Sequence, residues 1–228
     1  MSVLGKPARG VLRRLASATS GVAAIEFGFM LPILMTAGMY GTELAYMGTI
    51  NMRISQLALE VGDNAARMEQ TNNSSVAPTV TEADINQVMT GAQKEGLSFN
   101  FNPNGKVILT SLEKDPSTGK QFIHWQRCTG SLVRASAYGN NTTQNGLNGA
   151  ALTGMGQSGA QITAPSNLAV MYVEVFYQYT PLFGNLFVGT KQFKQEAAFI
   201  VRDIRDLQNA SSPKGTGITG TGSTSICT

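Results

Sequence analysis

The sequence predicts an α+β protein in which a long N-terminal helix, transmembrane in its first part and amphipathic in its second, packs on a small antiparallel β-sheet domain. Two observations lead to this prediction. An apolar segment near the N-terminus passes without a break into a pattern with helical spacing, and later segments alternate apolar and polar residues as strands do. The 228 residues leave room for one ordinary domain beside the helix.

The apolar segment predicts a membrane-spanning helix over residues 22–48. Sixteen residues between Glu26 and Glu43 carry no charge, and the segment is long enough for a hydrocarbon core about 30 Å thick. Ahead of it stand four basic residues and no acidic one: Lys6, Arg9, Arg13 and Arg14. This bias predicts that residues 1–21 stay in the cytoplasm and that the chain after the helix is exported. An ordinary secretory signal fits less well, because the apolar segment exceeds the roughly 7 to 15 residues of such a signal.

Glu26 is the unusual residue of this segment, since a carboxylate within the membrane costs at least about 2.5 kcal/mol if it cannot reach the interface. One interpretation is that Glu26 lies near enough to the helix start to snorkel to the headgroups. Its spacing favours another interpretation. A small residue, Gly21, stands five positions before Glu26, an aromatic residue, Phe27, follows it, and a basic leader precedes both.

The stretch GVAAIEFGFMLPILM that contains this pattern resembles the TadE-like pseudopilins of the tight-adherence (Flp pilus) system, which are type IV pilin-like proteins. The resemblance implies cleavage between Gly21 and Val22 by a membrane-embedded prepilin peptidase, with Glu26 and Phe27 in the processing site. The new α-amino group of Val22 would be largely cationic at neutral pH. In pilins the Glu of one subunit meets the amine of a neighbour, and such a pair offsets the desolvation of both groups. The resemblance thus assigns Glu26 to subunit assembly.

The same resemblance implies a non-enzymatic minor pseudopilin that acts in assembly of a tight-adherence pilus or secretion apparatus. Its expected partners are the prepilin peptidase, other pilus or pseudopilin subunits, assembly-platform membrane proteins and inner-membrane lipid. The expected location is the bacterial inner membrane, with one span and a periplasmic C-terminal domain, or the pilus itself. The alternative is an uncleaved, N-terminally anchored envelope protein whose exported domain binds a ligand or a surface.

Two features within the predicted span would serve contact between subunits. Pro32 lacks an N–H group and crowds the carbonyl of Gly28, so a kinked or easily loosened turn is expected there. Ala37, Gly41 and Ala45 repeat at four-residue spacing, which would let another helix approach closely. The alternative for this stripe is that Gly is simply common in membrane helices.

Beyond the span the helical period continues through residues 49–70, which predicts an extension of the same helix outside the membrane. Its apolar residues recur at spacings of three and four: Ile50, Ile54, Leu57, Val61, Ala65 and Met68. A continuous helix over residues 22–69 would be about 70 Å long, more than twice what a bilayer core requires. Its outer half must therefore pack on the rest of the chain.

Residues 79–208 are expected to form an exported, periplasmic α+β domain. A helix should begin at Thr81, with Asp84 as its capping partner, and stop by Gly96. Strands are expected next at 97–101, 106–112 and 121–128 as a three-stranded meander, and then at 168–179 and 190–202 as a hairpin. The expected core face of the first hairpin strand consists of Met171, Val173, Val175, Tyr177 and Tyr179.

The remaining segments are poor in large apolar residues. Residues 130–167 are expected to be a surface loop and a candidate face for other subunits. Residues 209–228 have the Gly, Ser and Thr content of a tail that does not fold alone. Cys128 and Cys227 are the only cysteines, and their spacing excludes a CxxC motif. An even pair in an exported domain predicts one disulfide that tethers the tail, with two free thiols as the alternative.

The sequence gives no support for an enzyme or a nucleic-acid-binding protein. The leader holds four of the 17 basic residues and none of the 14 acidic ones, so the rest of the chain carries 13 cations against 14 anions. GxSxG, P-loop and HExxH motifs are absent from the sequence. His124 is the only histidine, which excludes a multi-histidine metal site and favours a cross-strand structural role. No cofactor or metal is expected.

Overall fold

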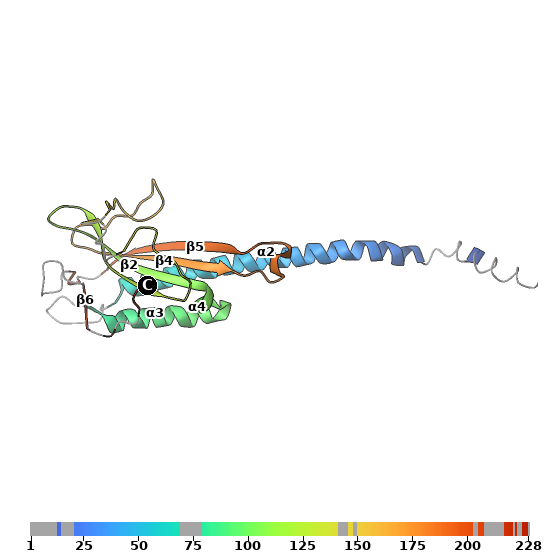
Figure 1. Ribbon diagram of the computed structural model, residues 1–228, viewed down its shortest axis with the longest axis horizontal. Coiled ribbons are helices and arrows are strands. Elements are labelled where there is room, and N and C mark those ends of the chain that lie inside the picture. Colours follow the sequence, from blue (N-terminus) through green and yellow to red (C-terminus); the bar gives the residue numbers. More distant parts are fainter. Residues whose placement is uncertain are drawn as a thin grey trace, which may run out of the picture.

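The computed structural model describes residues 13–14, 21–68, 79–140, 146–147, 150–202, 205–207, 217–220, 222 and 225–227. Within this part of the chain, a long helix projects from a domain built on a four-stranded antiparallel sheet (Figure 1). The predicted α+β layout with a long N-terminal helix is confirmed. Most of the predicted leader, residues 1–12 and 15–20, lies outside the described residues.

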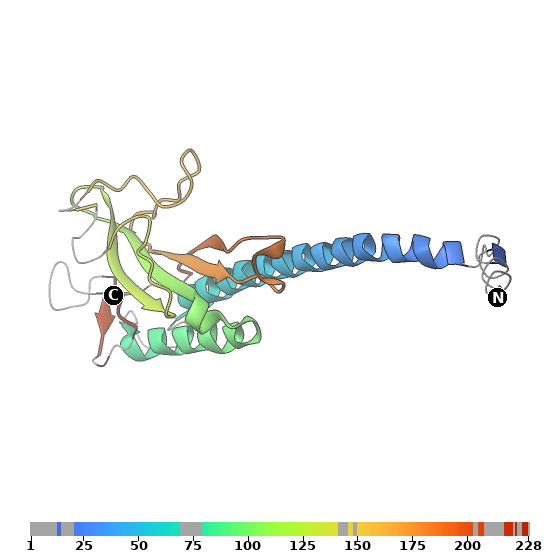
Figure 2. The ribbon, with the colours of Figure 1, turned by 45° about the vertical axis from the view of Figure 1, so that its right-hand side comes forward.

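Helix α2 (Val22–Ala66) is one continuous helix of 45 residues, about 67 Å long. Its first half stands alone beyond the domain in both views (Figures 1 and 2), and every residue from Val22 to Gly38 is exposed. Helical geometry continues through Pro32. The expectation of a kinked or easily loosened turn at this residue stays a prediction.

The second half of α2 packs on the sheet through the predicted stripe, which Met68 continues just beyond the end of the helix. All of these residues are buried: Ile50, Ile54, Leu57, Val61, Ala65 and Met68. The helix ends at Ala66, whereas the extension was expected to run to residue 70. Arg205 closes this end, because its guanidinium donates to the carbonyl of Ala65 at 3.2 Å and to that of Met68 at 2.7 Å. These bonds satisfy carbonyls that a helix terminus leaves without internal donors.

The sheet has the order β3-β2-β4-β5, with every neighbouring pair antiparallel. Its strands are β2 (Gly105–Lys114), β3 (Gln121–Thr129), β4 (Val170–Tyr179) and β5 (Lys191–Ile200). The predicted hairpin of the last two strands is confirmed, and Val173 pairs with Ala197 within it. The predicted face of β4 belongs to the core that α2 covers. Helix α2 runs along this hairpin (Figure 2).

The strand expected over residues 97–101 is wrong. The chain instead forms a 3₁₀ turn, η2 (Leu97–Phe99), and a short helix, α4 (Phe101–Asn104). Asn100 lies between them in the left-handed conformation, with φ of 55°. The rings of Phe99 and Phe101 lie 5.7 Å apart and both contact Tyr177. A compact turn thus buries both rings on one side, as a strand would. The spacing of Phe99 and Phe101 in the sequence therefore does not distinguish a turn from a strand.

Helix α3 (Glu82–Gly96) begins as predicted, with Thr81 as its N-cap and Asp84 completing the capping box. The amide of Asp84 donates to the Thr81 hydroxyl at 3.2 Å, and the Thr81 amide donates to the Asp84 carboxylate at 2.9 Å. The helix contacts α2 and β3, and its residues Ile85, Met89 and Ala92 are buried in the core that it shares with α2. An ion pair between Glu82 and Arg127 joins its first turn to β3.

The described residues between 130 and 167 keep a loop conformation but lie on the second face of the sheet. Met155 and Ala164 are buried against Val170 and Tyr172 of β4. Glu174, which has no exposed surface, accepts hydrogen bonds from the Ser136 hydroxyl and from the Ala137 amide at 3.1 Å. Lys194 lies 3.2 Å from the same carboxylate. This loop therefore covers the second face of the sheet.

The C-terminal segment is anchored along the outer edge of β3. A two-residue strand, β6 (Ile218–Thr219), pairs in parallel with β1 (Val80–Thr81). Further on, the amide of Cys128 donates to the carbonyl of Ser225 at 2.7 Å. The described residues of the predicted tail are thus packed against the domain, while residues 208–216 lie outside the described part of the chain.

Candidate functional site

The predicted processing bond lies at the start of α2. Gly21 is the N-cap residue of the helix, and a side chain built on it would meet no atom within 4 Å. Val22, Glu26 and Phe27 follow within the first two turns, and all three are exposed. The side chains of Val22 and Glu26 lie one turn apart on the same face, because residues at i and i+4 are neighbours on a helix.

The helix around this bond presents an apolar surface that the domain does not cover. Large side chains are more than half exposed, including Ile25, Phe27, Phe29, Ile33, Leu34 and Met35. Among the described residues, α2 is the one helix long and apolar enough to cross a membrane, and none of its most apolar window is buried. An exposed apolar surface of this extent marks a contact with lipid or protein. The helix is consistent with membrane anchoring.

The predicted small-residue stripe divides between two surroundings. Gly41 and Ala45 are exposed and lie about 160° around the helix from the residue that faces the domain, Glu43. A side chain added at Gly41 would meet no atom within 4 Å, so this face is open to another helix. Ala37 lies instead with Pro32 in a shallow apolar groove, which Phe187 bounds on the domain side.

Glu43 is a site residue that the sequence did not reveal. It is 0% exposed, and its carboxylate accepts hydrogen bonds from the Tyr179 hydroxyl and from the amides of Leu182 at 3.2 Å and Phe183 at 3.1 Å. These donors come from the end of β4 and the loop after it. Burial, and the hydrogen bond to this carboxylate, raise the pKa of Tyr179 above its ordinary value, which keeps the hydroxyl a donor.

Glu26 and Glu43 lie on the same helix but differ in burial and in the partners that the described chain supplies. Three donors from this chain surround Glu43, which removes most of the cost of its burial. None of the described residues forms a salt bridge with Glu26, which projects from the bare half of the helix. The carboxylate that the sequence singled out is the one that the described part of the fold leaves exposed.

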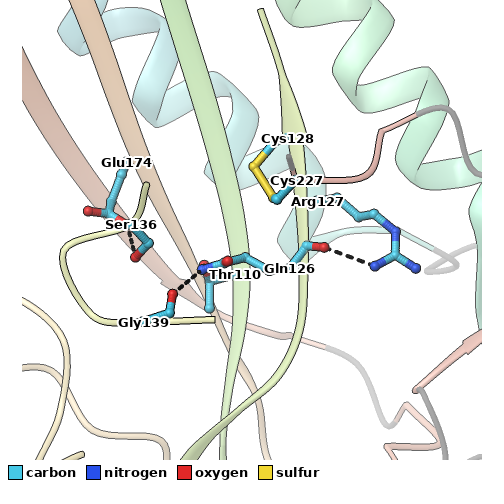
Figure 3. Close-up of a disulfide and its surroundings, with 8 residues drawn as sticks. All are labelled: Thr110, Gln126, Arg127, Cys128, Ser136, Gly139, Glu174 and Cys227. Carbon is cyan, nitrogen blue, oxygen red and sulfur yellow. Dashed lines mark hydrogen bonds between the residues drawn. A yellow bond between two sulfur atoms is a disulfide. The ribbon is translucent and has the colours of Figure 1, made fainter. Parts of the chain in front are cut away.

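The predicted disulfide between Cys128 and Cys227 is present and closes a loop across 99 positions. It lies where β3 meets the C-terminal segment (Figure 3). Gln126 on the same strand donates to the Thr110 hydroxyl at 3.0 Å and to the Gly139 carbonyl at 3.2 Å. Figure 3 also shows Ser136 beside Glu174. The disulfide and these bonds join the tail and the covering loop to one sheet.

His124 has the cross-strand structural position that its sequence context predicts. Its Nδ1 lies 2.9 Å from the carboxylate of Glu113 on the neighbouring strand, and the Ser111 hydroxyl donates to the same carboxylate at 2.8 Å. His124 and Glu113 line a cavity of about 270 Å³, slightly below the roughly 300 to 1,000 Å³ of typical ligand sites. Within the described ranges, no group of three or more His, Cys, Asp or Glu residues is placed to hold a metal ion.

The structure thus separates two regions of α2. One is an exposed apolar half with Gly21, Glu26 and Gly41, and the other is a half fixed to the domain from Glu43 onward. No family model, curated protein or solved structure matches this chain. The geometry of α2 and its contacts is therefore what bears on function.

Proposed function

We propose that this chain is a non-enzymatic minor pseudopilin of the TadE-like kind. A prepilin peptidase cuts it between Gly21 and Val22, the first half of α2 holds it in a bacterial inner membrane, and it acts in assembly of a tight-adherence pilus or related secretion apparatus. The observation that carries this proposal is the contrast between the exposed Glu26 and the fully satisfied Glu43.

An exposed carboxylate in a membrane helix needs a partner from outside its own domain. Leaving it unpaired in the hydrocarbon region costs at least about 2.5 kcal/mol. Cleavage before Val22 creates an amine one turn away from Glu26, so each processed subunit offers a cation and an anion on one face. A neighbouring helix with the same pattern complements both, and the pairing sets the register between the two helices.

Two further features support the proposal. The open face at Gly41 and Ala45 permits close approach of a second helix, as small residues do in membrane helix pairs. The disulfide is chemically stable in an oxidising compartment such as the periplasm, where the domain is proposed to lie. Other pseudopilin subunits and the assembly platform are the proposed partners of the bare half of α2.

The experiment replaces Glu26 by Gln, which removes the charge and keeps the shape, in cells that make the complete pilus system. We expect the variant to insert and to form its disulfide, because Glu26 makes no contact that holds the described domain. We expect it to lose co-purification with other pilus subunits and to lose pilus output in the sheared fraction.

The matched control is Glu43→Gln on the same helix. It should lower the thermal stability of the domain, because the carboxylate that accepts three hydrogen bonds has been replaced by an amide with one acceptor oxygen. Normal pilus output and partner recovery from Glu26→Gln would refute the assembly role. A fall in domain stability in Glu26→Gln equal to that of Glu43→Gln would show a folding role instead.

A further inference from the structure

The loop between β4 and β5 lies beside α2 at the point where the bare half of the helix leaves the domain (Figure 1). Its backbone amides at Leu182 and Phe183 hold the Glu43 carboxylate, and the ring of Phe187 lies 5.9 Å from that of Tyr40. The loop is thus fixed to the helix at two points. It turns through a short 3₁₀ element, η3 (Gly184–Leu186).

The outer surface of this loop is uncharged and presents two large apolar side chains, with Asn185 as an exposed polar residue between them. Residues 180–190 read TPLFGNLFVGT and contain no charged side chain. Leu182 is 50% exposed and Leu186 is 70% exposed, although Val188 behind them is buried. The apolar surface continues without a charged residue onto the helix through the groove between Phe187, Tyr40 and Ile33.

The position of the loop along the helix corresponds to the outer boundary of a bilayer. From Val22 to Glu43 the helix rises about 32 Å, close to the roughly 30 Å of a hydrocarbon core. If Val22 stands at the inner boundary, Tyr40 and Glu43 stand at the outer one. The loop, which contacts both, then lies at the level where acyl chains meet headgroups.

The burial of Glu43 fits this position. A carboxylate at the edge of the hydrocarbon cannot rely on water for its hydrogen bonds, and here the loop and Tyr179 supply three donors. The side of the loop that faces Glu43 is polar through its backbone, and the opposite side is apolar through Leu182 and Leu186. This arrangement is expected of a segment that lies between the Glu43 carboxylate and lipid.

We propose that the β4–β5 loop is a second membrane contact, in which Leu182 and Leu186 enter the outer boundary of the bilayer that α2 spans. Glu43 is the positioning residue that fixes the loop to the helix. This goes beyond the assembly role and rests only on the part of the proposed function that anchors α2 in a membrane. Two contacts with one bilayer fix the tilt of the exported domain, which a single helix does not.

Site-directed labelling of the full chain in phosphatidylethanolamine and phosphatidylglycerol vesicles tests the proposal. The two native cysteines form the disulfide, so an introduced cysteine is the single free thiol of the described chain. Leu186→Cys is compared with Leu97→Cys, since Leu97 is the same residue type and is 74% exposed on the same domain. Co-flotation with the vesicles reports on the anchor independently of the label.

We expect a charged, membrane-impermeant maleimide to react at position 186 at least about tenfold more slowly than at position 97, because a charged reagent does not enter the hydrocarbon boundary. Both thiols should react fully after denaturation in sodium dodecyl sulfate. Adding Glu43→Ala should release the loop and bring the rate at 186 towards that at 97.

A fluorophore at each thiol gives a second readout with lipids brominated near the headgroup end of the acyl chain. Quenching is expected at position 186 and not at position 97. Equal labelling rates with no difference in quenching, in chains that float with the vesicles, would overturn the loop contact and leave the anchor in place. Chains that fail to float would overturn the anchor and the loop contact together.

Discussion

At the scale of single residues, the described fold supplies partners to two acidic side chains of α2, Asp63 and Glu43, and leaves Glu26 exposed. Asp63 has Arg67 at 2.9 Å and Arg202 at 3.7 Å, and Glu43 has its three donors. Glu26 was identified from a local pattern, its spacing from Gly21. The donors to Glu43 come from 136 to 140 positions away, so no local pattern identifies them.

The neighbouring carboxyl groups of Glu60 and Glu95 predict that the stability of the domain depends on pH. Glu95 on α3 lies against Glu60 on α2, and partial burial together with this neighbouring carboxyl raises the pKa of Glu95 to about 7, above its ordinary value of 4.5. Between these values the folded state binds more protons than the unfolded state. The free energy of unfolding therefore falls as the pH rises from about 4.5 through 7.

The variant Glu95→Gln removes this titration, so its stability relative to the wild type should rise across the same window. The measurement is the melting temperature of the disulfide-intact protein in detergent at pH 5 and pH 8, at constant ionic strength. The difference in melting temperature, variant minus wild type, should be larger at pH 8 than at pH 5. An identical pH profile in the two proteins would contradict the raised pKa of Glu95.

At the scale of elements, periodicity predicted the helices well and the first strand of the meander badly. The stripe on α2 and the capping box of α3 depend on residues three and four positions apart, which local spacing records. The segment at Phe99 and Phe101 satisfies the strand pattern equally well with a turn at Asn100, and the choice depends on contact with Tyr177. That contact is long-range in sequence.

Gly62 of α2 packs closely on Phe199 of β5, and this contact leads to a prediction. A Cβ atom at this position would stand 2.6 Å from the ring of Phe199. Gly62→Ala should therefore lower the free energy of unfolding by about 1 to 2 kcal/mol, because overpacking outweighs the gain in helix propensity. Gly91→Ala on α3 is the matched control, since nothing lies within 4 Å of its added Cβ.

Thermal or denaturant unfolding of both variants decides the comparison. The control should gain about 0.5 to 1 kcal/mol, as an exposed glycine replaced in a helix interior does. We therefore predict that the change in free energy of unfolding has opposite signs in the two variants. A gain at Gly62 equal to that at Gly91 would mean that the helix and β5 are not in close contact.

At the scale of the whole molecule, the fold covers both faces and one edge of its sheet. The helices cover one face, the loop over residues 130–167 the other, and the C-terminal segment the edge at β3. The covering of the second face was predictable in part, because Val170, Tyr172 and Phe176 are apolar residues opposite the expected core face of β4. The path of the C-terminal segment could not be predicted, since only Cys227 and Ile218 indicate where it packs.

The disulfide should contribute a large part of the domain's stability. Closing a loop of about 100 residues corresponds to about 4 to 5 kcal/mol in the chain-entropy model, as an upper figure. Cys227→Ser should lower the melting temperature and expose the C-terminal segment and the β3 edge to protease. The hairpin of β4 and β5 lies at the opposite side of the sheet and should stay resistant.

Limited proteolysis followed by mass spectrometry locates the first cuts. Cys128→Ser and the double variant serve as controls, because removing either cysteine or both should give the same loss if one bond is responsible. A Cys227→Ser protein with unchanged melting temperature and unchanged protease pattern would show that the tail is held without the disulfide.

The central claim is that the chain is processed at the start of α2 and keeps the helix. The most direct measurement is the N-terminal sequence and intact mass of the membrane-extracted protein, made in cells with and without a prepilin peptidase. We predict an N-terminus of Val-Ala-Ala-Ile-Glu in the first case and the full-length chain in the second. Gly21→Leu should remain uncut, whereas Gly28→Leu, an exposed glycine two turns further along the same helix, should be cut normally. An N-terminus at Met1 or Ser2 in peptidase-positive cells would contradict the account.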